Sequence, residues 1–401
     1  MVLGAIVLGK LTEAIDERID SPVGARHFLI DDPSTAAVVA STIATATLAF
    51  VAVVFATTLV AIQLAASQYS PRAVRIFIRS RVTRVTLGIF LATFVFAVTT
   101  LIGSRANLGA TDQYAPQVSI SVLVVLTVAT VLGFVAYLHG VVRLMRVQYL
   151  LANVAEETRG SILDCFPPES AYVDVDPPRA DDQPRDLRYA AAAGVMSAID
   201  EPGLVDLCRT RDCWFELTVG VGEYLAHGTL IGRVHGGDLD HTQVVGHLLV
   251  RGERTFLQDP GFGIRQLVDI AIRALSPAVN DPTTAVQALD RLNDLLAVAG
   301  TRPRPSGLRI DAANITRVQL RVVDFAQLLT LALTEIIRYG ADAPQVVRRL
   351  GALLDELEAQ LAEASRAVVI DHRELLAQAV ASALPAPFSA VASTSDRRGL
   401  G

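Results

Sequence analysis

Charged residues are scarce in this chain, and lysine is almost missing from it. Of the 401 residues 19% are charged, and Lys10 is the only lysine. Soluble domains carry about 25% charged residues. A hydrophobic content of 51% and a mean hydropathy of +0.42 accompany this shortage of charge, so the composition indicates a membrane protein. The net charge of −6, without a basic stripe interleaved with aromatic residues, excludes nucleic acid as a partner.

Catalytic and metal-binding motifs are also missing. The sequence contains no G-x-S-x-G, Walker A or H-E-x-x-H motif, and no complete G-x-G-x-x-G between a strand and a helix. Two cysteines and three histidines lie in one region, but five residues separate successive histidines, which suits zinc poorly: Cys208, Cys213, His235, His241 and His247. We therefore expect no enzyme activity, no catalytic residue, no metal and no cofactor.

Three long apolar runs are present instead. They cover about residues 35–66, 85–102 and 118–142, and none carries Asp, Glu, Lys or Arg near its middle. Each is long enough to cross a bilayer as a helix, whereas a buried helix of a soluble protein shows a charged polar stripe. Residues 35–147 are thus predicted to form a transmembrane domain with the lipid bilayer as its partner. Without intramembrane charges, an ion-coupled carrier is not expected.

Residues 1–34 precede the first span. The apolar stretch Met1–Leu11 (MVLGAIVLGKL) has about ten apolar positions, too few to cross a bilayer. It also lacks the basic start and small-residue cleavage site of a signal peptide. Two readings remain open: an interfacial helix, or the end of a spanning helix whose beginning is missing from this chain.

The arginines predict the orientation in the membrane. Short loops rich in Lys and Arg stay in the cytoplasm. Five arginines lie between the first two spans and two follow the third: Arg72, Arg75, Arg79, Arg81, Arg84, Arg143 and Arg146. Everything after residue 146 is therefore expected in the cytoplasm. The cysteines, with Cys165 as the third, are then expected to be free thiols in a reducing compartment.

The end of the first span, TTLVAIQLAASQYSPR (residues 57–72), is unusually polar. A helix from residue 36 to 68 is about 50 Å long, well beyond the bilayer core. With a seven-residue period, small and polar side chains form a seam, with polar residues at its inner end: Thr42, Thr45, Ala49, Ala52, Ala56, Thr57, Gln63, Ser67 and Gln68. The seam is either a helix–helix contact within one subunit or a lining repeated around a symmetry axis, past which ions or small solutes move passively.

Residues 148–384 are expected to form a cytoplasmic α+β domain, followed by a disordered tail at 385–401. A small β unit is predicted at about 189–250, with a helix at 202–210 capped by Asp200. VGVGEYLAHGTLIGRV resembles the turn and return of lipoyl- or biotinyl-type barrel-sandwich domains, which implies a small β-barrel-like element; no lysine is available to carry the cofactor. The rest, about 255–380, is predicted helical, with a strand at RVQLRVV and helices at 325–339 and 344–367.

Charged and capping residues follow the β unit. Arg265, Asp269 and Arg273 are spaced for ion pairs along one helix. Asn280 or Asp281, before Pro282, predicts the cap of the next helix. These residues and Arg254 form either a structural ion-pair and capping network or, as the second reading, a ligand site.

Three segments resemble a bacterial family of predicted membrane proteins of unknown function. They are AIQLAASQYSPR, RVTLGIFLATFVFAV and ERTFLQDPGFGIRQLVDIAIRALSPAVNDPTTA, and the resemblance runs from about Ala40 to Glu374. Family members typically have a further transmembrane helix at the N-terminus, which implies that Met1–Leu11 is its remnant. The resemblance implies no activity, substrate or catalytic residue.

The expected fold is mostly α: an α-helical transmembrane bundle with a cytoplasmic α+β domain that contains a small β-barrel-like element. The expected location is the inner membrane of a bacterium. The leading functional hypothesis is a passive homo-oligomeric channel whose cytoplasmic domain assembles or gates it. The alternative is a non-conducting scaffold or sensor that presents the cytoplasmic domain to a partner.

Overall fold

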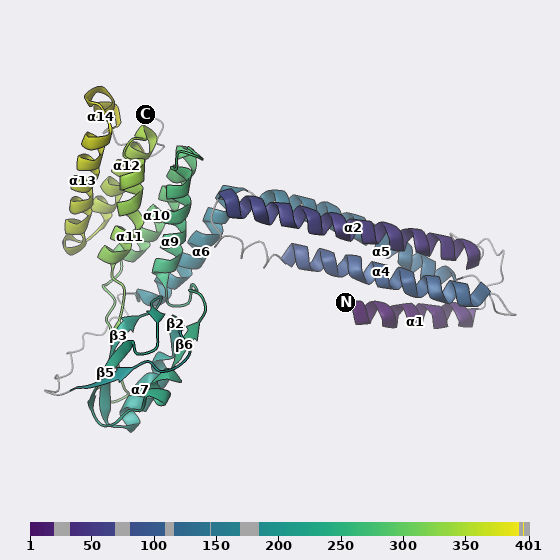
Figure 1. Ribbon diagram of the computed structural model, residues 1–401, viewed down its shortest axis with the longest axis horizontal. Coiled ribbons are helices and arrows are strands. Elements are labelled where there is room, and N and C mark those ends of the chain that lie inside the picture. The colour runs from purple at the N-terminus through teal and green to yellow at the C-terminus, as the bar shows by residue number, and fades with distance from the viewer. Residues whose placement is uncertain are drawn as a thin grey trace. The chain divides into compact units, whose positions relative to one another are not determined.

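The computed structural model describes residues 1–19, 33–68, 81–108, 116–144, 146–168, 184–392 and 396. It divides into an N-terminal unit, Met1–Tyr149, and a C-terminal unit, Leu150–Gly401, with the boundary inside helix α6 (Figure 1). Each unit has its own packed core, and each is described by itself.

The N-terminal unit is a bundle of long helices: α1 (Val2–Ile19), α2 (Pro33–Gln68), α4 (Arg81–Leu108) and α5 (Gln117–Leu144). Three of them are long and apolar enough to span a membrane, over Pro33–Gln63, Thr83–Leu108 and Gln117–Arg143. This agrees with the three predicted spans. Pro33 lies in the first turn of α2, where its missing N–H costs nothing, and no glycine or proline interrupts the helix after it.

Helix α4 is the centre of this bundle, because α1, α2 and α5 all contact it (Figure 1). Rings from α2, α4 and α5 meet in one cluster, with centroids 5.0 Å apart for Phe50 and Phe134 and 6.1 Å apart for Phe50 and Phe90. Helix α1 runs parallel to α4. A Cβ added at Gly9 would lie 2.9 Å from Thr99 Cγ2, so glycine permits the close approach of the two helices.

The C-terminal unit combines two β-sheets with a helical layer. After α6 (Val147–Cys165) come β1 (Arg185–Arg188), β2 (Gly194–Ile199), α7 (Glu201–Thr210), β3 (Cys213–Gly220), β4 (Tyr224–Leu225), β5 (Leu230–Gly236), α8 (His241–Val245) and β6 (Leu248–Arg251). The chain continues through α9 (Pro260–Ala274), α10 (Pro282–Gly300), β7 (Leu308–Ile310), β8 (Thr316–Arg321), α11 (Phe325–Gly340), α12 (Pro344–Gln360), α13 (Glu363–Ala383) and α14 (Ala386–Ala392).

The strands form a five-stranded sheet in the order β1-β5-β3-β8-β7 and a three-stranded sheet in the order β4-β2-β6. Strands β3 and β5 pair antiparallel, with Phe215 opposite Val234, while β3 and β8 pair parallel, with Phe215 opposite Val318. The buried side chains between the sheets and α7 include Met196, Leu204 and Phe215. The alternation of buried and half-buried residues along β3 follows the period of two expected for a strand.

The predicted β-barrel-like element is wrong. Among the described residues neither sheet closes on itself. The glycine spacing correctly marked turns, since Gly222 and Gly228 have φ of +94° and +86°. However, β4 leaves the β3–β5 hairpin and pairs with β2 in the other sheet, and the free edge of β3 is taken by β8 from far along the chain. Short-range glycine spacing carries no information about that long-range pairing.

The helical layer differs from the prediction at its end. The single helix predicted at 344–367 is divided, because Leu361 between α12 and α13 is extended (φ −89°, ψ 151°). Leu361 is buried there, and its side chain lies so close to Gly300 that a Cβ at that position would collide with Leu361 Cδ2. Helix α13 contacts both α11 and α12. The tail predicted to be disordered from residue 385 contains the short helix α14, which contacts α12. The strand predicted at RVQLRVV is present as β8, and β7, which was not predicted, pairs with it at the edge of the sheet.

Candidate functional site

The seam predicted on the first span lies on the outer face of α2. The side chains of Thr42, Thr45, Ala49, Ala52, Ala56 and Gln63 are all exposed in the single chain, and Thr57 is half-buried. The face that packs inside the chain carries other small and apolar residues: Ala36, Ala40, Ala44, Thr47, Val54 and Ala61. At 3.6 residues per turn the two faces are about 180° apart on the helix. The side chains of Ser67 and Gln68 lie outside the described residues.

The seam hydroxyls are bonded within their own helix. Thr42 Oγ1 donates to Val38 O at 2.8 Å, and Thr45 Oγ1 donates to Ser41 O at 2.9 Å. Their protons are therefore satisfied, while oxygen lone pairs remain available to water, an ion or another helix. The exposed amide of Gln63 has both donors and an acceptor to satisfy.

Thr57, expected at the inner end of the seam, takes part in a contact within the chain. Its hydroxyl lies 3.0 Å from Tyr137 Oη on α5, and Thr58 Oγ1 lies 2.6 Å from the same atom. Tyr137 Oη also donates to Val54 O at 3.1 Å, and its side chain is buried. A second polar link, Thr93 Oγ1 to Thr130 Oγ1 at 2.9 Å, joins α4 and α5. Hydroxyl contacts of this kind hold helices together in lipid.

Asp16 of α1 provides a further polar link. Its carboxylate accepts from Val118 N at 2.7 Å, from Ser119 N at 2.9 Å and from Ser119 Oγ at 2.6 Å. It therefore caps the N-terminus of α5 from another helix, where a negative charge is favoured. No local pattern in the sequence indicates this role, because the cap is supplied from a distant segment.

The charged residues that follow the β unit form two ion-pair groups that share no residue. Arg254 Nε and Nη2 donate to the two carboxylate oxygens of Asp259, each at 2.9 Å. Arg265 Nε donates to Asp269 at 2.8 Å, and its Nη2 donates to Glu335 Oε2 of α11, also at 2.8 Å. The hydrogen bond from Arg265 holds the pKa of Glu335 below its usual value.

The predicted capping residues lie at the start of α10. Asp281 accepts from Thr284 N at 3.1 Å and from Thr284 Oγ1 at 2.6 Å, while Asn280 before it has a left-handed φ of +48°. Arg273, the third residue of the predicted stripe, is half-buried on α9. The guanidinium groups of Arg254 and Arg265 form ion pairs with carboxylates of the same chain, which favours a structural role for this network over a ligand site.

Two partners in this network were missed from the sequence. Asp259 accepts from Phe262 N at 3.0 Å and so caps α9. The Asp-Pro pattern that predicted the Asp281 cap is also present at Asp259 and Pro260, so a local signal existed. Glu335 lies on a helix 70 residues beyond Arg265, and only the tertiary fold brings the two together.

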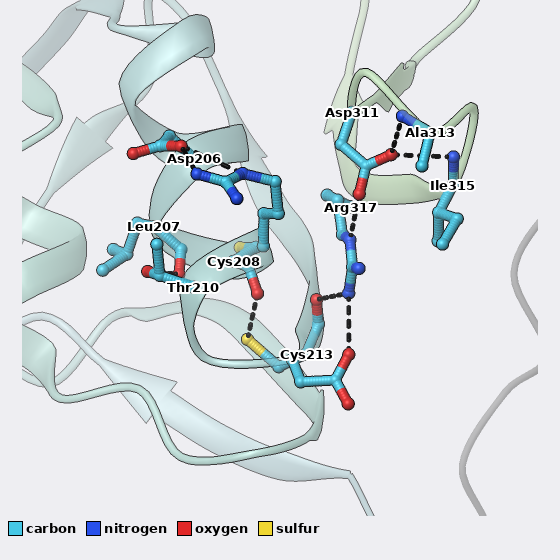
Figure 2. A network of polar contacts seen from close by, with 11 residues as sticks. Asp206, Leu207, Cys208, Thr210, Cys213, Asp311, Ala313, Ile315 and Arg317 are labelled. Carbon is cyan, nitrogen blue, oxygen red and sulfur yellow. Dashed lines mark hydrogen bonds and ion pairs between the residues drawn. The ribbon is translucent and has the colours of Figure 1, made fainter.

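Arg317 on β8 centres another polar network, shown in Figure 2. Its Nε donates to Asp311 Oδ2 at 2.8 Å, while Asp311 Oδ1 accepts from Ala313 N at 2.9 Å and from Ile315 N at 3.0 Å. The hydrogen bond from Arg317 is the main cause of a lowered pKa at Asp311, and the two backbone hydrogen bonds lower it further. The Asp311 carboxylate thus links the turn between β7 and β8 to Arg317 on β8.

The same arginine reaches the cysteine region. Arg317 Nη1 donates to Cys213 O at 3.4 Å, and Cys213 Sγ donates to Cys208 O at 3.6 Å (Figure 2). Both cysteines are buried free thiols. The side-chain interaction between the two thiols, distinct from the bond to Cys208 O, raises the pKa of Cys208 and lowers that of Cys213. Burial, helped by the charge of Asp164, raises the pKa of Cys165 to about 12.

The three histidines near these cysteines have separate partners. His235 stacks on Trp214 with ring centroids 3.8 Å apart, His247 Nδ1 lies 2.9 Å from Asp200 Oδ2, and His241 Nε2 accepts from Ala190 N at 2.9 Å. Asp200 also caps α7, as predicted, by accepting from Gly203 N at 3.2 Å. Within the described ranges, no group of three or more His, Cys, Asp or Glu side chains is arranged to hold a metal ion.

Three apolar helices of spanning length, joined by buried hydroxyl contacts, define a multi-span membrane protein. The chain belongs to the family described as "Predicted membrane protein (DUF2254)", whose model matches residues 1–356. This confirms the resemblance seen in the sequence. Uncharacterized proteins of Mycobacterium bovis and Mycobacterium tuberculosis are each 30% identical to it over 333 residues, which cover 80% of this chain and 63% of theirs. The chain thus spans less than two thirds of these curated relatives. No solved structure matches it.

Proposed function

We propose that the chain is a subunit of a passive, homo-oligomeric channel in the bacterial inner membrane, with the α2 seam facing a shared lumen. The observation that carries this proposal is the exposure of the seam, from Thr42 to Gln63, on the face of α2 opposite to its packing face. A glutamine that faces hydrocarbon leaves its amide groups unsatisfied at a cost of several kcal/mol. Further copies of α2 around a wet lumen remove that cost.

The charges of the spans agree with passive movement. Within the three described spans the charged residues are Arg84, Arg105 and Arg143, all close to span ends. Carriers driven by protons or ions place ionisable groups in the middle of the membrane. A lumen lined by hydroxyl, amide and small side chains favours ions or small solutes that move down their gradient. The C-terminal unit, on the cytoplasmic side in this proposal, assembles or gates the channel.

The first test concerns the oligomer. A disulfide forms only when the two Cα atoms approach within roughly 7 Å. Oxidation of the Ala52→Cys variant in membranes should therefore give a cross-linked dimer. Ala136→Cys is the matched control, because Ala136 is an exposed alanine on α5, outside the seam. Equal cross-linking of both variants, or of neither, contradicts a symmetric α2 contact.

The second test concerns conduction. The full chain is reconstituted into phosphatidylethanolamine–phosphatidylglycerol vesicles loaded with K⁺ and, separately, with glycerol. We expect release above that of empty vesicles, a reduced release for Ala56→Leu, which narrows the lumen, and unchanged release for Ala136→Leu. A cross-linked oligomer that releases neither solute rules out the channel and leaves the non-conducting scaffold that presents the C-terminal unit.

A further inference from the structure

A small polar cavity lies among α1, α4 and α5, apart from the α2 seam. Its volume is about 10 Å³, close to the space that one water-sized occupant needs. The polar side chains that line it are Glu13, Asp16, Thr99, Thr100, Ser104, Asn107 and Ser119. Gly103 of α4 makes room for Glu13, since a Cβ added there would lie 2.7 Å from Glu13 Oε1.

Two hydroxyl groups in this cavity have no hydrogen-bond partner in the part of the chain that the structure describes. Thr100 and Ser104 are 7% and 3% exposed, and neither Oγ atom bonds to any described residue. Hydroxyls on membrane helices normally donate to the carbonyl one turn earlier, as Thr99 does to Val95 O at 2.7 Å and Ser121 to Gln117 O at 2.7 Å. Thr100 and Ser104 are four residues apart, so both face the cavity from one side of α4.

The charge of the cavity is negative. Among the described residues that line it, Glu13 and Asp16 are the charged ones, and none is arginine or lysine. Asp16 is 2% exposed and fixed by its three bonds to the start of α5. Glu13 pairs with the exposed Lys10 at 2.7 Å, which compensates one of the two carboxylates and leaves one negative charge. No positively charged side chain among the described lining residues offsets the remaining negative charge, and a cation of single charge would do so.

We propose that this cavity binds one small monovalent cation of the size class of Na⁺, held by oxygens of Glu13, Asp16, Thr100 and Ser104. Carboxylate and hydroxyl oxygens suit hard cations. A divalent ion would leave excess positive charge, and an anion would meet two carboxylates. Because the ligands come from α1 and α4, and Asp16 also holds α5, the bound ion stabilises the packing of these three helices. This site does not depend on the channel proposal.

The experiment measures ion-dependent stability and direct binding on the purified full chain in detergent. Thermal unfolding is followed in NaCl, KCl and N-methyl-D-glucamine chloride at equal ionic strength, and ²²Na⁺ binding is measured in parallel. We expect a saturable rise in Tm with Na⁺, a smaller rise with K⁺, and bound ²²Na⁺ that approaches one ion per chain.

Variants then locate the ion. Ser104→Ala and Thr100→Val each remove one ligand, and we expect the Kd for Na⁺ to rise roughly tenfold or more. Ser121→Ala, which removes a hydroxyl already bonded to its own helix, should leave the Kd unchanged. Equal Tm values in all three salts together with no bound ²²Na⁺ would overturn the proposal and leave water as the occupant. Unchanged Na⁺ binding in both Ser104→Ala and Thr100→Val would overturn it as well.

Discussion

The hydroxyl groups of Thr58 and Tyr137 lie 2.6 Å apart and join α2 to α5 inside the helix bundle. Tyr137 is 1% exposed, and its hydroxyl also meets Thr57 and the carbonyl oxygen of Val54. The hydroxyl of one buried tyrosine thus contacts three groups on α2. In a low-dielectric surrounding such a network stabilises one arrangement of the two helices over others.

This network makes Tyr137→Phe a sharp test of how the N-terminal unit is held together. The ring remains, and Thr58 keeps its own bond to Val54 O at 2.6 Å, so only the interhelical bonds are lost. We expect a loss of about 0.5–1.5 kcal/mol of stability, seen as a lower Tm of the full chain in detergent. Tyr339→Phe, at an exposed tyrosine, is the control and should leave Tm unchanged. A Tm for Tyr137→Phe equal to that of the control contradicts the network.

A second prediction ranks two helix caps. Asp259 is 4% exposed and both caps α9 and pairs with Arg254, whereas Asp281 caps α10 without a described ion pair. Loss of a cap alone costs about 1 kcal/mol, and loss of hydrogen bonds to a charged group adds roughly 1.5–3 kcal/mol. Asp259→Ala should therefore lower the stability of the C-terminal unit more than Asp281→Ala. Urea unfolding of both variants decides the order, and the reverse order contradicts the assignment.

The third prediction concerns pH. The folded state lowers the pKa of Asp311, chiefly through the hydrogen bond from Arg317. The stabilisation is then fully present above the unfolded Asp pKa of about 3.9 and is lost as the pH falls through the lower, folded pKa. The chain has one tryptophan, Trp214, on β3 beside Cys213, so its fluorescence reports unfolding of this region.

Asp311→Asn should lower the urea midpoint at pH 7 and flatten its fall in the acid range. Asp206→Asn is the matched control, because Asp206 forms an exposed pair with Arg209. Its acid dependence should follow that of the wild type. An Asp311→Asn curve with the same acid slope as the wild type contradicts the role of this carboxylate.

A fourth prediction concerns the thiols. Cys208 and Cys213 are 0% and 3% exposed, and burial raises the pKa of Cys165 to about 12. Since the thiolate is the reactive form, iodoacetamide should label the native chain slowly at pH 7.5 and label all three cysteines after unfolding in urea. Peptide masses identify the labelled residue. Rapid labelling of Cys208 in the native chain contradicts its burial.

The features predicted well from the sequence are those with a local cause. Uninterrupted apolar runs predicted the spans, and Asp200 and Asp281 before proline-containing first turns predicted two caps. The missed features depend on distant residues. Strand β4 pairs with β2 because the tertiary fold brings them together, and Asp16 caps a helix that starts about a hundred residues later. The break at Leu361 has no glycine or proline that would mark it in the sequence. It accompanies the burial of the Leu361 side chain, which depends on the tertiary fold.

For the α2 seam, the residues were identified from their period, but their orientation was not. A seven-residue period shows that Thr42, Ala49, Ala56 and Gln63 share a face, whereas the neighbours of that face depend on α4 and α5. The helix has small residues on both sides, so composition alone does not distinguish the inner face, with Ala36 and Ala40, from the outer one. The packing against α4 makes this distinction.

The last prediction concerns membrane orientation, on which the cytoplasmic placement of the C-terminal unit depends. Four arginines lie between the first two described spans, Arg84 and Arg143 lie at the adjoining span ends, and Arg146 follows the third span, while Arg105 is at the opposite end of α4. Because positively charged short loops are retained in the cytoplasm, a fluorescent protein fused after Gln148 should fluoresce, and alkaline phosphatase fused at the same point should be inactive. Alkaline phosphatase inserted at Ala110, between α4 and α5, should be active outside. The opposite pattern at both positions would place the C-terminal unit outside the cell and remove the cytoplasmic gating role from the channel proposal.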